Sequence, residues 1–291
     1  MDHAGRYIVI PRIQVEHANA LQTWWIIAPP SPMTIQGLVR AMGLRLGHHF
    51  EAFAVVHHSV QWLASEGDPS GRSVHAADAP DEWVAMFWNR TLALQQPQGA
   101  SYIDRDDHID GGISKGLQPT ARCHVTLSLV LEAPPDSALT DFEIARFLRT
   151  ARLAGGSIIA HGAIRFADSR AEALALLRHG FFLVDRADLV AMRMARAATP
   201  IDGLEALLEL LVARDSDPDV TPEPWLSANV VGYTTLEAPR QRAGVRQGAP
   251  HAYAEALVGL VQYQPARHAG VLPLWRYAVD DQRRAYLVRS A

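Results

Sequence analysis

The sequence predicts an α+β fold in which an antiparallel sheet carries long insertions. Two observations lead to this prediction. Short runs typical of strands recur along the chain and are interleaved with a few amphipathic helical segments. The first 47 residues also read as a strand, a polar turn and an amphipathic helix, which is the opening of a ferredoxin-like, RRM-type core. We therefore expect residues 1–291 to form a single elaborated domain of this type.

The opening segment contains the clearest local signals. Residues 7–14 are rich in β-branched side chains and predict a strand, and Pro11 removes a ladder donor, so we expect an edge or a bulge there. Ser31 followed by Pro32 is a helix-start signal, because serine caps the first turn and proline fits the first helical position. The helix continues with apolar residues at helical spacing, namely Ile35, Leu38, Val39, Met42 and Leu46. Arg40 lies off this stripe and is free for other contacts.

The rest of the chain alternates strand and helix patterns. Residues 50–63 and 125–131 read as strands, and residues 141–153 read as a helix that stops at Gly155 and Gly156. Later strands are expected at 157–163, 181–185, 230–236, 257–263, 272–277 and 285–288, and later helices at 170–178 and 203–212.

Two insertions and the charge distribution stand apart from this pattern. Residues 95–122 show little periodicity over a length that is usually functional or disordered. Residues 200–225 read as an acidic helical insertion. A net charge of −4 argues against general affinity for nucleic acids. Farther along, however, Arg240, Arg242 and Arg246 make a local basic region, which indicates a local anionic partner.

The composition excludes several kinds of protein. Cys123 is the only cysteine, which excludes an internal disulfide and a thiolate zinc site. No apolar run approaches the roughly 18 residues of a membrane span, and the chain does not open with a signal-peptide pattern. We therefore expect a cytoplasmic protein without a membrane partner. The glycine-rich stretches at 110–116 and 152–158 lack the Walker and GxGxxG spacings, so we expect no cofactor. His57 and His58 are neighbours in a predicted strand and face opposite sides of the sheet, and no HExxH or His/Asp set with metal spacing lies around them, so we expect no metal.

Several residues fit more than one role. Gly155 and Gly156 fit either a helix end that leads into a strand or a close approach of the backbone to a ligand or neighbour. Trp24 follows a polar turn, so its ring either stacks on an unpaired base or anchors in the core. A metal-independent ribonuclease needs a general base near the 2′-hydroxyl. The candidates for such a base are His17, His58 and His161.

Three separated stretches carry a resemblance to a known family. The first is PRIQVEHANA, followed by a proline-serine-proline bend and a helix of the form GLVRAMGLRL. The second is RLAGGSI, and the third is GYTTLEAPRQRAGVR followed by HAYAEALVGLVQY. In their order and spacing these stretches resemble the second Csy subunit of type I-F CRISPR surveillance complexes, which belongs to the repeat-associated (RAMP) proteins.

The resemblance implies a non-catalytic RNA-binding subunit. Such a subunit holds the 5′ handle of the CRISPR RNA beside the large subunit and the backbone subunits, and it meets target DNA only indirectly because the guide does the pairing. It also implies that the core is of the RAMP type and that residues 95–122 are a candidate protruding hairpin. Two alternatives stay open: a RAMP-type endoribonuclease that processes CRISPR RNA, and a protein-interaction module that does not bind RNA.

The residues that we expect to contact RNA lie in four parts of the chain. Gln14 and Asn19 carry both donors and acceptors, which suits the reading of base edges. In an extended segment Arg240 and Arg242 point the same way, so they form either a phosphate clamp or part of a solvated loop. The full set is Arg12, Gln14, His17, Asn19, Trp24, Ser31, Arg40, Gly155, Gly156, Arg240, Arg242 and Arg246.

Overall fold

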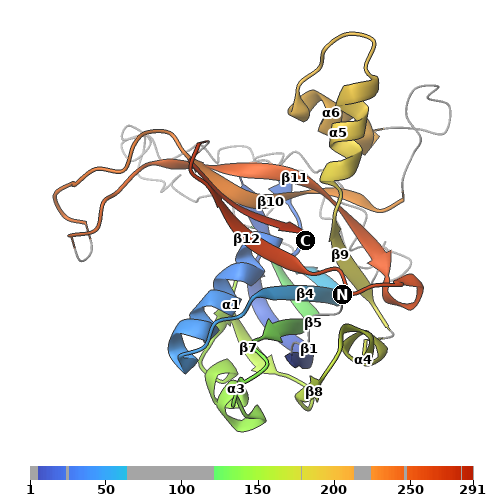
Figure 1. Ribbon diagram of the computed structural model, residues 1–291, viewed down its shortest axis with the longest axis vertical. Coiled ribbons are helices and arrows are strands. Elements are labelled where there is room, and N and C mark those ends of the chain that lie inside the picture. Colours follow the sequence, from blue (N-terminus) through green and yellow to red (C-terminus); the bar gives the residue numbers. More distant parts are fainter. Residues whose placement is uncertain are drawn as a thin grey trace, which may run out of the picture.

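The computed structural model describes residues 6–23, 26–63, 121–177, 179–212, 224–245, 248–282 and 284–290. It is a mixed α/β structure dominated by one large antiparallel sheet with few helices, as the sequence predicted (Figure 1). The eleven strands are β1 (Arg6–Asn19), β4 (Ala52–Leu63), β5 (Arg122–Ala133), β6 (Arg152–Leu153), β7 (Gly156–Ala160), β8 (Arg165–Ala167), β9 (Phe181–Asp185), β10 (Leu226–Thr235), β11 (Ala254–Pro265), β12 (Trp275–Asp280) and β13 (Ala285–Ser290). Their order is β12-β13-β10-β11-β9-β4-β5-β1-β7-β6, with β8 also paired to β1. A small separate sheet contains β2 (Leu21–Thr23) and β3 (Ile26–Ile27).

Helix α1 (Pro32–Leu46) follows the sequence signals closely. The hydroxyl of Ser31 accepts a hydrogen bond from the Thr34 amide at 3.2 Å, and Pro32 occupies the first turn. Gly47 ends the helix with a φ of 71°, a left-handed conformation that glycine adopts without steric cost. The apolar stripe faces the sheet, and Arg40 points away from it.

Helices α1 and α3 (Asp141–Leu148) cover one face of β1, β4 and β5. The core between these elements includes Ile35, Leu38, Val39 and Met42 of α1, Ile144 and Leu148 of α3, and Ile10, Phe53 and Leu129 of the strands. Full burial of side chains of this size stabilises the fold by about 1.5–3 kcal/mol each. Among the described residues, the opposite face is covered at one end, where Ala173 of α4 (Arg170–Ala175), Leu177, Leu272 and Leu274 pack in one cluster with Tyr7 and Val9.

The strands β9 to β13 continue the sheet and return to β4. Trp275 of β12 pairs with Phe53 of β4, and its indole Nε1 donates to the Leu183 carbonyl oxygen at 2.8 Å. Trp275 is fully buried in the same core that α1 covers. The C-terminal strands are therefore fastened to the middle of the sheet.

A buried carboxylate joins four elements of the fold. Glu132 of β5 accepts hydrogen bonds from the Tyr7 hydroxyl at 2.8 Å and from Arg170 of α4 at 3.2 Å. Arg276 of β12 donates to the second carboxylate oxygen. The Glu132 side chain is only 7% exposed, so its charge is balanced by these guanidinium groups rather than by water.

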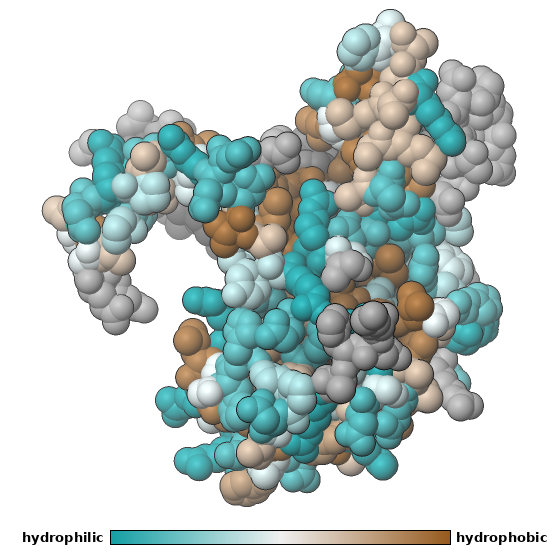
Figure 2. Space-filling view, in the orientation of Figure 1, coloured by the Kyte–Doolittle hydropathy of each residue, from teal (hydrophilic) through white to brown (hydrophobic). Residues whose placement is uncertain are grey.

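Two parts of the molecule project from the sheet (Figure 1). One is the pair α5 (Ala187–Arg196) and α6 (Gly203–Val212), in which α6 packs on β10 through Ala206, Leu207, Leu210 and Leu211. The other is residues 236–245 and 248–253, here named the arm, which extend the hairpin of β10 and β11. Hydrogen bonds join Leu236 to Tyr253 at 2.9 Å and His251 to Arg240 at 2.8 Å along the arm. The visible face of the arm is largely hydrophilic (Figure 2).

Some predicted elements differ in extent. The helix expected at 141–153 ends at Leu148, because residues 152–160 form the hairpin of β6 and β7 instead. The strand expected at 272–277 lies at Trp275–Asp280, since Leu272 and Leu274 are buried in the core beside α4. The helix expected at 203–212 is confirmed, and it is the described part of the acidic insertion 200–225. The insertion 95–122 lies outside the described residues except for its last two. In the described segments, no helix has both the length and the apolarity that a membrane crossing requires.

Candidate nucleic-acid interface

The face of β5 that α1 and α3 leave uncovered carries a row of polar side chains. Cys123, Val125 and Leu127 belong to the core, so the alternate residues His124, Thr126 and Ser128 lie on the opposite face. This opposite face is here named the open face. It contains a hollow of about 230 Å³, whose polar lining includes Gln14, Ser59, Gln61, His124 and Thr126.

Two β-bulges in β1 place Arg12 and His17 beside this row. In the first bulge, Pro11 and Arg12 together lie opposite the single residue Ser128. In the second, Glu16 and His17 together lie opposite His124. Both Arg12 and His17 have a φ of 55°, which costs an L-residue on the order of 1–2 kcal/mol. Their amides donate to Ser128 Oγ at 3.0 Å and to His124 Nδ1 at 3.3 Å. The bulge expected near Pro11 is thus confirmed, and a second one repeats its geometry.

The bulges decide where the side chains of β1 point. The first bulge keeps both Ile10 and Ile13 on the core side, and the second does the same for Val15 and Ala18, although two residues separate each pair. Arg12 and His17 are exposed. Gln14 lies between them, pairs with Thr126 and is also exposed. Three of the sequence-predicted residues therefore share the open face.

A third bulge brings His58 of β4 to the same place. The register shifts between His57 and Ser59, and His58 Nε2 lies 2.6 Å from Ser128 Oγ. Burial, together with the charge of Arg12 and the nearby His179, lowers the pKa of His58 to about 4. His58 is therefore neutral at physiological pH. Its neighbour His57 points into the core against the ring of Tyr263, with the ring centroids 5.5 Å apart.

Two other predicted residues have local structural contacts. The side-chain amide of Asn19 donates to the Leu21 carbonyl at 3.0 Å, and its oxygen accepts from the Leu21 amide at 3.1 Å. Ser31 is 2% exposed and caps α1. Both side chains stabilise the turn and the helix start, and neither lies in the row on β5.

The remaining arginines are on other surfaces. Arg40 is exposed on α1, which covers the face opposite to the open face. Arg240 and Arg242 lie on the arm, and both pair with Glu237, the first at 3.2 Å. Arg242 also lies over the ring of Tyr253, 4.8 Å from its centroid. Trp24 and Arg246 lie outside the described residues.

Gly155 and Gly156 form a tight turn and a close strand contact. Ala154 and Gly155 have φ values of 51° and 73°, as a two-residue hairpin turn requires, so the expected helix end is wrong here. A Cβ on Gly156 would lie 2.5 Å from the Glu16 carbonyl oxygen and 2.7 Å from the Ala18 amide. The close approach is therefore to the neighbouring strand β1, beside the His17 bulge.

The sequence reasoning missed the polar row on β5. The signal was present, because polar residues occupy every second position from His124 to Ser128 between apolar ones. The alternation predicts the strand, but it does not by itself assign a function to the polar side chains on one of its faces. Pro11 marks the bulge at Arg12, but the bulges at His17 and His58 depend on pairing with β5 and have no signal in the local sequence.

The described residues show no metal centre. They contain no group of three or more His, Cys, Asp or Glu side chains that is placed to hold a metal. The ring of His17 meets that of His124 edge-on, with centroids 4.9 Å apart. His161 Nδ1 lies 2.8 Å from the Gly162 carbonyl. The polar side chains on β1 and β5 are of the kinds that contact the bases and phosphates of a single-stranded nucleic acid, and they line one continuous surface, the open face.

Comparison with known proteins identifies one family. The family model described as CRISPR-associated protein (Cas_Csy2) matches residues 8–288. Among solved structures, the crystal structure of a CRISPR protein from Archaeoglobus fulgidus is 9% identical over 99% of this chain and 99% of that chain, with a TM-score of 0.27. The search of curated proteins gives no match. The family match spans nearly the whole chain, and it is the finding from which a function follows.

Proposed function

Since the chain belongs to the Csy2 family of CRISPR-associated proteins, the second subunit of type I-F Csy complexes, we propose that it binds the 5′ handle of the CRISPR RNA. The family implies membership of a multi-subunit CRISPR complex. In our proposal the protein is a non-catalytic subunit that bridges the large subunit and the backbone filament. The guide pairs with target DNA, so this subunit meets the target only indirectly.

The strand order supports a ferredoxin-like core of the RAMP type. The segment β1–α1–β4–β5–α3–β7 contributes four strands in the order β4-β5-β1-β7, all antiparallel. Helices α1 and α3 cover one face of these strands. In folds of this kind the face without helices is the platform for single-stranded RNA. We also take the whole chain to be one elaborated domain, because a single sheet connects β6 to β12.

The observation that carries the proposal is the pair of strained bulges on the open face. A left-handed conformation at an arginine and a histidine is unfavourable, and such strain is concentrated at functional sites. At both positions a β5 side chain accepts the bulge amide and so stabilises the strained backbone. The guanidinium of Arg12 suits a phosphate or a base edge, and the amide of Gln14 suits a base edge.

The arm supplies a second contact in this proposal. Arg240 and Arg242 both reach Glu237, which agrees with the expected common direction of their side chains. Glu237 balances one of the two charges, so the pair offers a phosphate one positive charge rather than two. Together with Arg246, the pair forms the proposed phosphate clamp.

Replacement of Glu237 by glutamine frees both guanidinium groups. It should therefore raise RNA affinity and steepen the salt dependence of binding, by about 0.7 log units per added phosphate contact.

A non-catalytic role is supported by the state of the histidines. A general base works best with a pKa near the operating pH. The pKa of His58 is lowered to about 4 by burial, and its Nε2 is engaged with Ser128. We therefore expect the purified protein to bind repeat RNA without cutting it. Metal-independent cleavage that depends on His17 or His58 would instead favour the processing endoribonuclease.

The open face is tested by a pair of arginine variants. Arg12→Gly removes the guanidinium and suits the left-handed backbone, and Arg149→Gln removes an exposed arginine from the end of α3 on the other side of the sheet. Affinity for handle RNA is measured for both in the full-length protein. We expect Arg12→Gly to weaken binding roughly tenfold or more and Arg149→Gln to bind like the wild type. Equal affinities in all three proteins would remove the open face from the RNA path. No RNA binding by the wild type or by the assembled complex would favour the protein-interaction module.

A further inference from the structure

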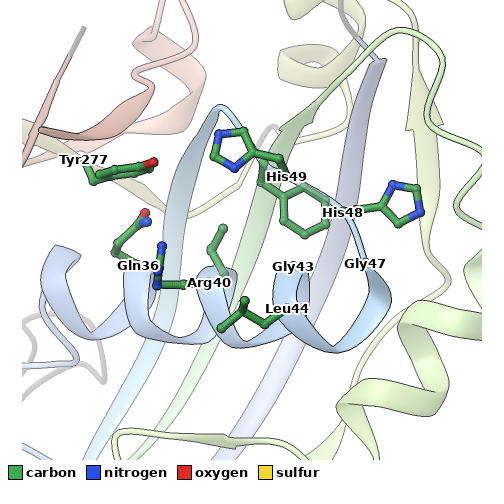
Figure 3. Close-up of a pocket in the computed structure, with 10 residues that line it drawn as sticks. Gln36, Arg40, Gly43, Leu44, Gly47, His48, His49 and Tyr277 are labelled. Carbon is green, nitrogen blue, oxygen red and sulfur yellow. The ribbon is translucent and has the colours of Figure 1, made fainter. Parts of the chain in front are cut away.

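A second hollow, of about 330 Å³, lies on the helical side of the sheet (Figure 3). It lies between the outer side of α1, the loop that joins α1 to β4, and strand β12. Its lining includes Gln36, Arg40, His49 and Tyr277. Because α1 packs on the face opposite to the row of β5, the sheet separates this hollow from the open face. The size suits a ligand at the small end of the usual range for protein pockets.

Tyr277 presents an aromatic platform to this hollow. Its ring is stacked on that of Tyr286, with centroids 5.8 Å apart and an angle of 13° between the planes. The Tyr286 hydroxyl is hydrogen-bonded with Gln36, which is 6% exposed and held in α1. The ring of His49 stands edge-on at 6.4 Å from Tyr277. Tyr286 thus supports one face of the Tyr277 ring, and Tyr277 itself is half-buried.

Arg40 supplies a cation whose charge is not balanced locally. Its guanidinium extends from α1 toward the space beside Gln36 and Tyr277 (Figure 3). Within the described part of the chain, no carboxylate lies within ion-pair distance of Arg40. This distinguishes it from Arg276, which is held by Glu51 at 4.0 Å and by Glu132. A guanidinium beside an aromatic face is the combination with which proteins hold a phosphate and an unpaired base together.

We propose that this hollow binds one nucleotide, with the base stacked on Tyr277 and the phosphate at Arg40. This proposal depends on the hollow and its lining residues, and it does not depend on RNA binding by the open face of β5. The ligand is a nucleoside phosphate with an unpaired base, either free or as one residue of a single strand. Base stacking supplies affinity with little preference among bases, and the charged contact requires the phosphate.

The test uses the full-length protein, titrated with four nucleoside monophosphates, the matching nucleosides and short single-stranded oligonucleotides. Tyr277→Leu keeps an apolar side chain and removes the ring, and Tyr277→Phe restores the ring. Arg40→Gln removes the charge. The controls are Arg45→Gln, exposed on the same helix, and Phe142→Leu, which removes an exposed ring on α3.

We expect Tyr277→Leu to weaken nucleotide binding roughly tenfold or more, and Tyr277→Phe to bind like the wild type. Arg40→Gln should weaken binding of monophosphates roughly tenfold and leave binding of nucleosides unchanged. Oligonucleotides that bind much more tightly than monophosphates identify a residue of a strand as the ligand; equal affinities identify a free nucleotide. Lack of saturable binding of all of these by the wild type would overturn the proposal, as would variants that bind like the controls.

Failure of this proposal is distinguishable from failure of the proposed function. Handle RNA that loses affinity with Arg12→Gly but not with Tyr277→Leu keeps the open face on the RNA path and takes the hollow off it; the nucleotide titrations then decide whether the hollow binds a free nucleotide. The reverse result keeps the hollow and moves the RNA path to the helical side of the sheet.

Discussion

Replacing His57 by leucine is expected to make the stability of the protein less sensitive to acid. His57 is fully buried on β4, and neither ring nitrogen has a hydrogen-bond partner among the described residues. Burial lowers its pKa from 6.5 to about 3, and the neighbouring His58 contributes in the same direction. The folded protein therefore holds this ring neutral far into the acid range, and the cost of its burial depends on pH.

The direction and size of the pH effect on stability follow from the difference in the pKa of His57 between the folded and the unfolded state. Below pH 6.5 the unfolded chain takes up a proton at His57 and the folded protein does not, so stability is full above pH 6.5 and falls as the pH falls toward 3. At about 1.36 kcal/mol per pKa unit, the step from pH 7 to pH 5 costs roughly 2 kcal/mol of unfolding free energy. His58, with its pKa lowered to about 4, adds roughly 2 kcal/mol more by the same reasoning. That sum is a large part of the stability of an ordinary domain.

The assay is urea unfolding followed by intrinsic fluorescence at pH 7 and pH 5. We expect His57→Leu to lose roughly 2 kcal/mol less than the wild type between the two conditions. At pH 7 the variant should be as stable as the wild type or more so, because a buried ring with unmatched nitrogens has been replaced by an apolar side chain. His268→Gln, which removes an exposed histidine, serves as the control. A variant that loses as much stability as the wild type would refute the reasoning.

Three further outcomes follow from the fold. Arg12→Gly and His17→Gly should leave the melting temperature unchanged or raise it, because glycine adopts the left-handed conformation without cost; thermal melting that falls by several degrees would show that the side chains hold the bulges. Glu132→Ala should lower the free energy of unfolding by about 1–3 kcal/mol, because it removes the charged hydrogen bonds that join two partly exposed guanidinium groups and the Tyr7 hydroxyl to a buried carboxylate; denaturant unfolding measures this, and a change near zero would contradict the burial argument. Gly156→Ala should destabilise the protein and disturb the adjacent bulge, since a Cβ would lie 2.5 Å from the Glu16 carbonyl oxygen; near-native melting together with native RNA affinity would count against the close approach.

The sequence predicts the elements that carry their own start and stop signals. Ser31 and Pro32 define the beginning of α1, and Pro11 predicts a bulge, because each of these residues restricts the backbone wherever it stands. The start of α5 was not predicted. Its N-cap position is Arg186, which makes no capping hydrogen bond from its side chain; the first turn is instead supported by Asp185, whose Oδ1 accepts from the Ala187 amide at 3.0 Å, one position before the usual cap.

The parts that sequence reasoning missed depend on distant partners. Gly155 stands in a hairpin turn rather than at a helix end because the following strand pairs with β1, which is far away in the sequence. The open face arises in the same way, since Arg12 and Ser128 are 116 residues apart and meet only after β1 pairs with β5. For this reason the sequence indicated Arg12, Gln14 and His17 individually but not the surface that they share.

The return of β12 to β4 has a consequence for biosynthesis. Arg276 and Glu132 are 144 residues apart, so the carboxylate leaves the ribosome long before its second guanidinium partner. At translation rates of about 5–20 residues per second, the delay is roughly 7 to 30 seconds. Contacts of such high sequence separation also slow folding. Until β9 leaves the ribosome, the side of β4 that it pairs with is an unpaired edge, and the part of that side at Phe53 stays unpaired until β12 follows. We expect the nascent chain to need protection from aggregation at β4, and incorporation into its complex to follow translation rather than accompany it.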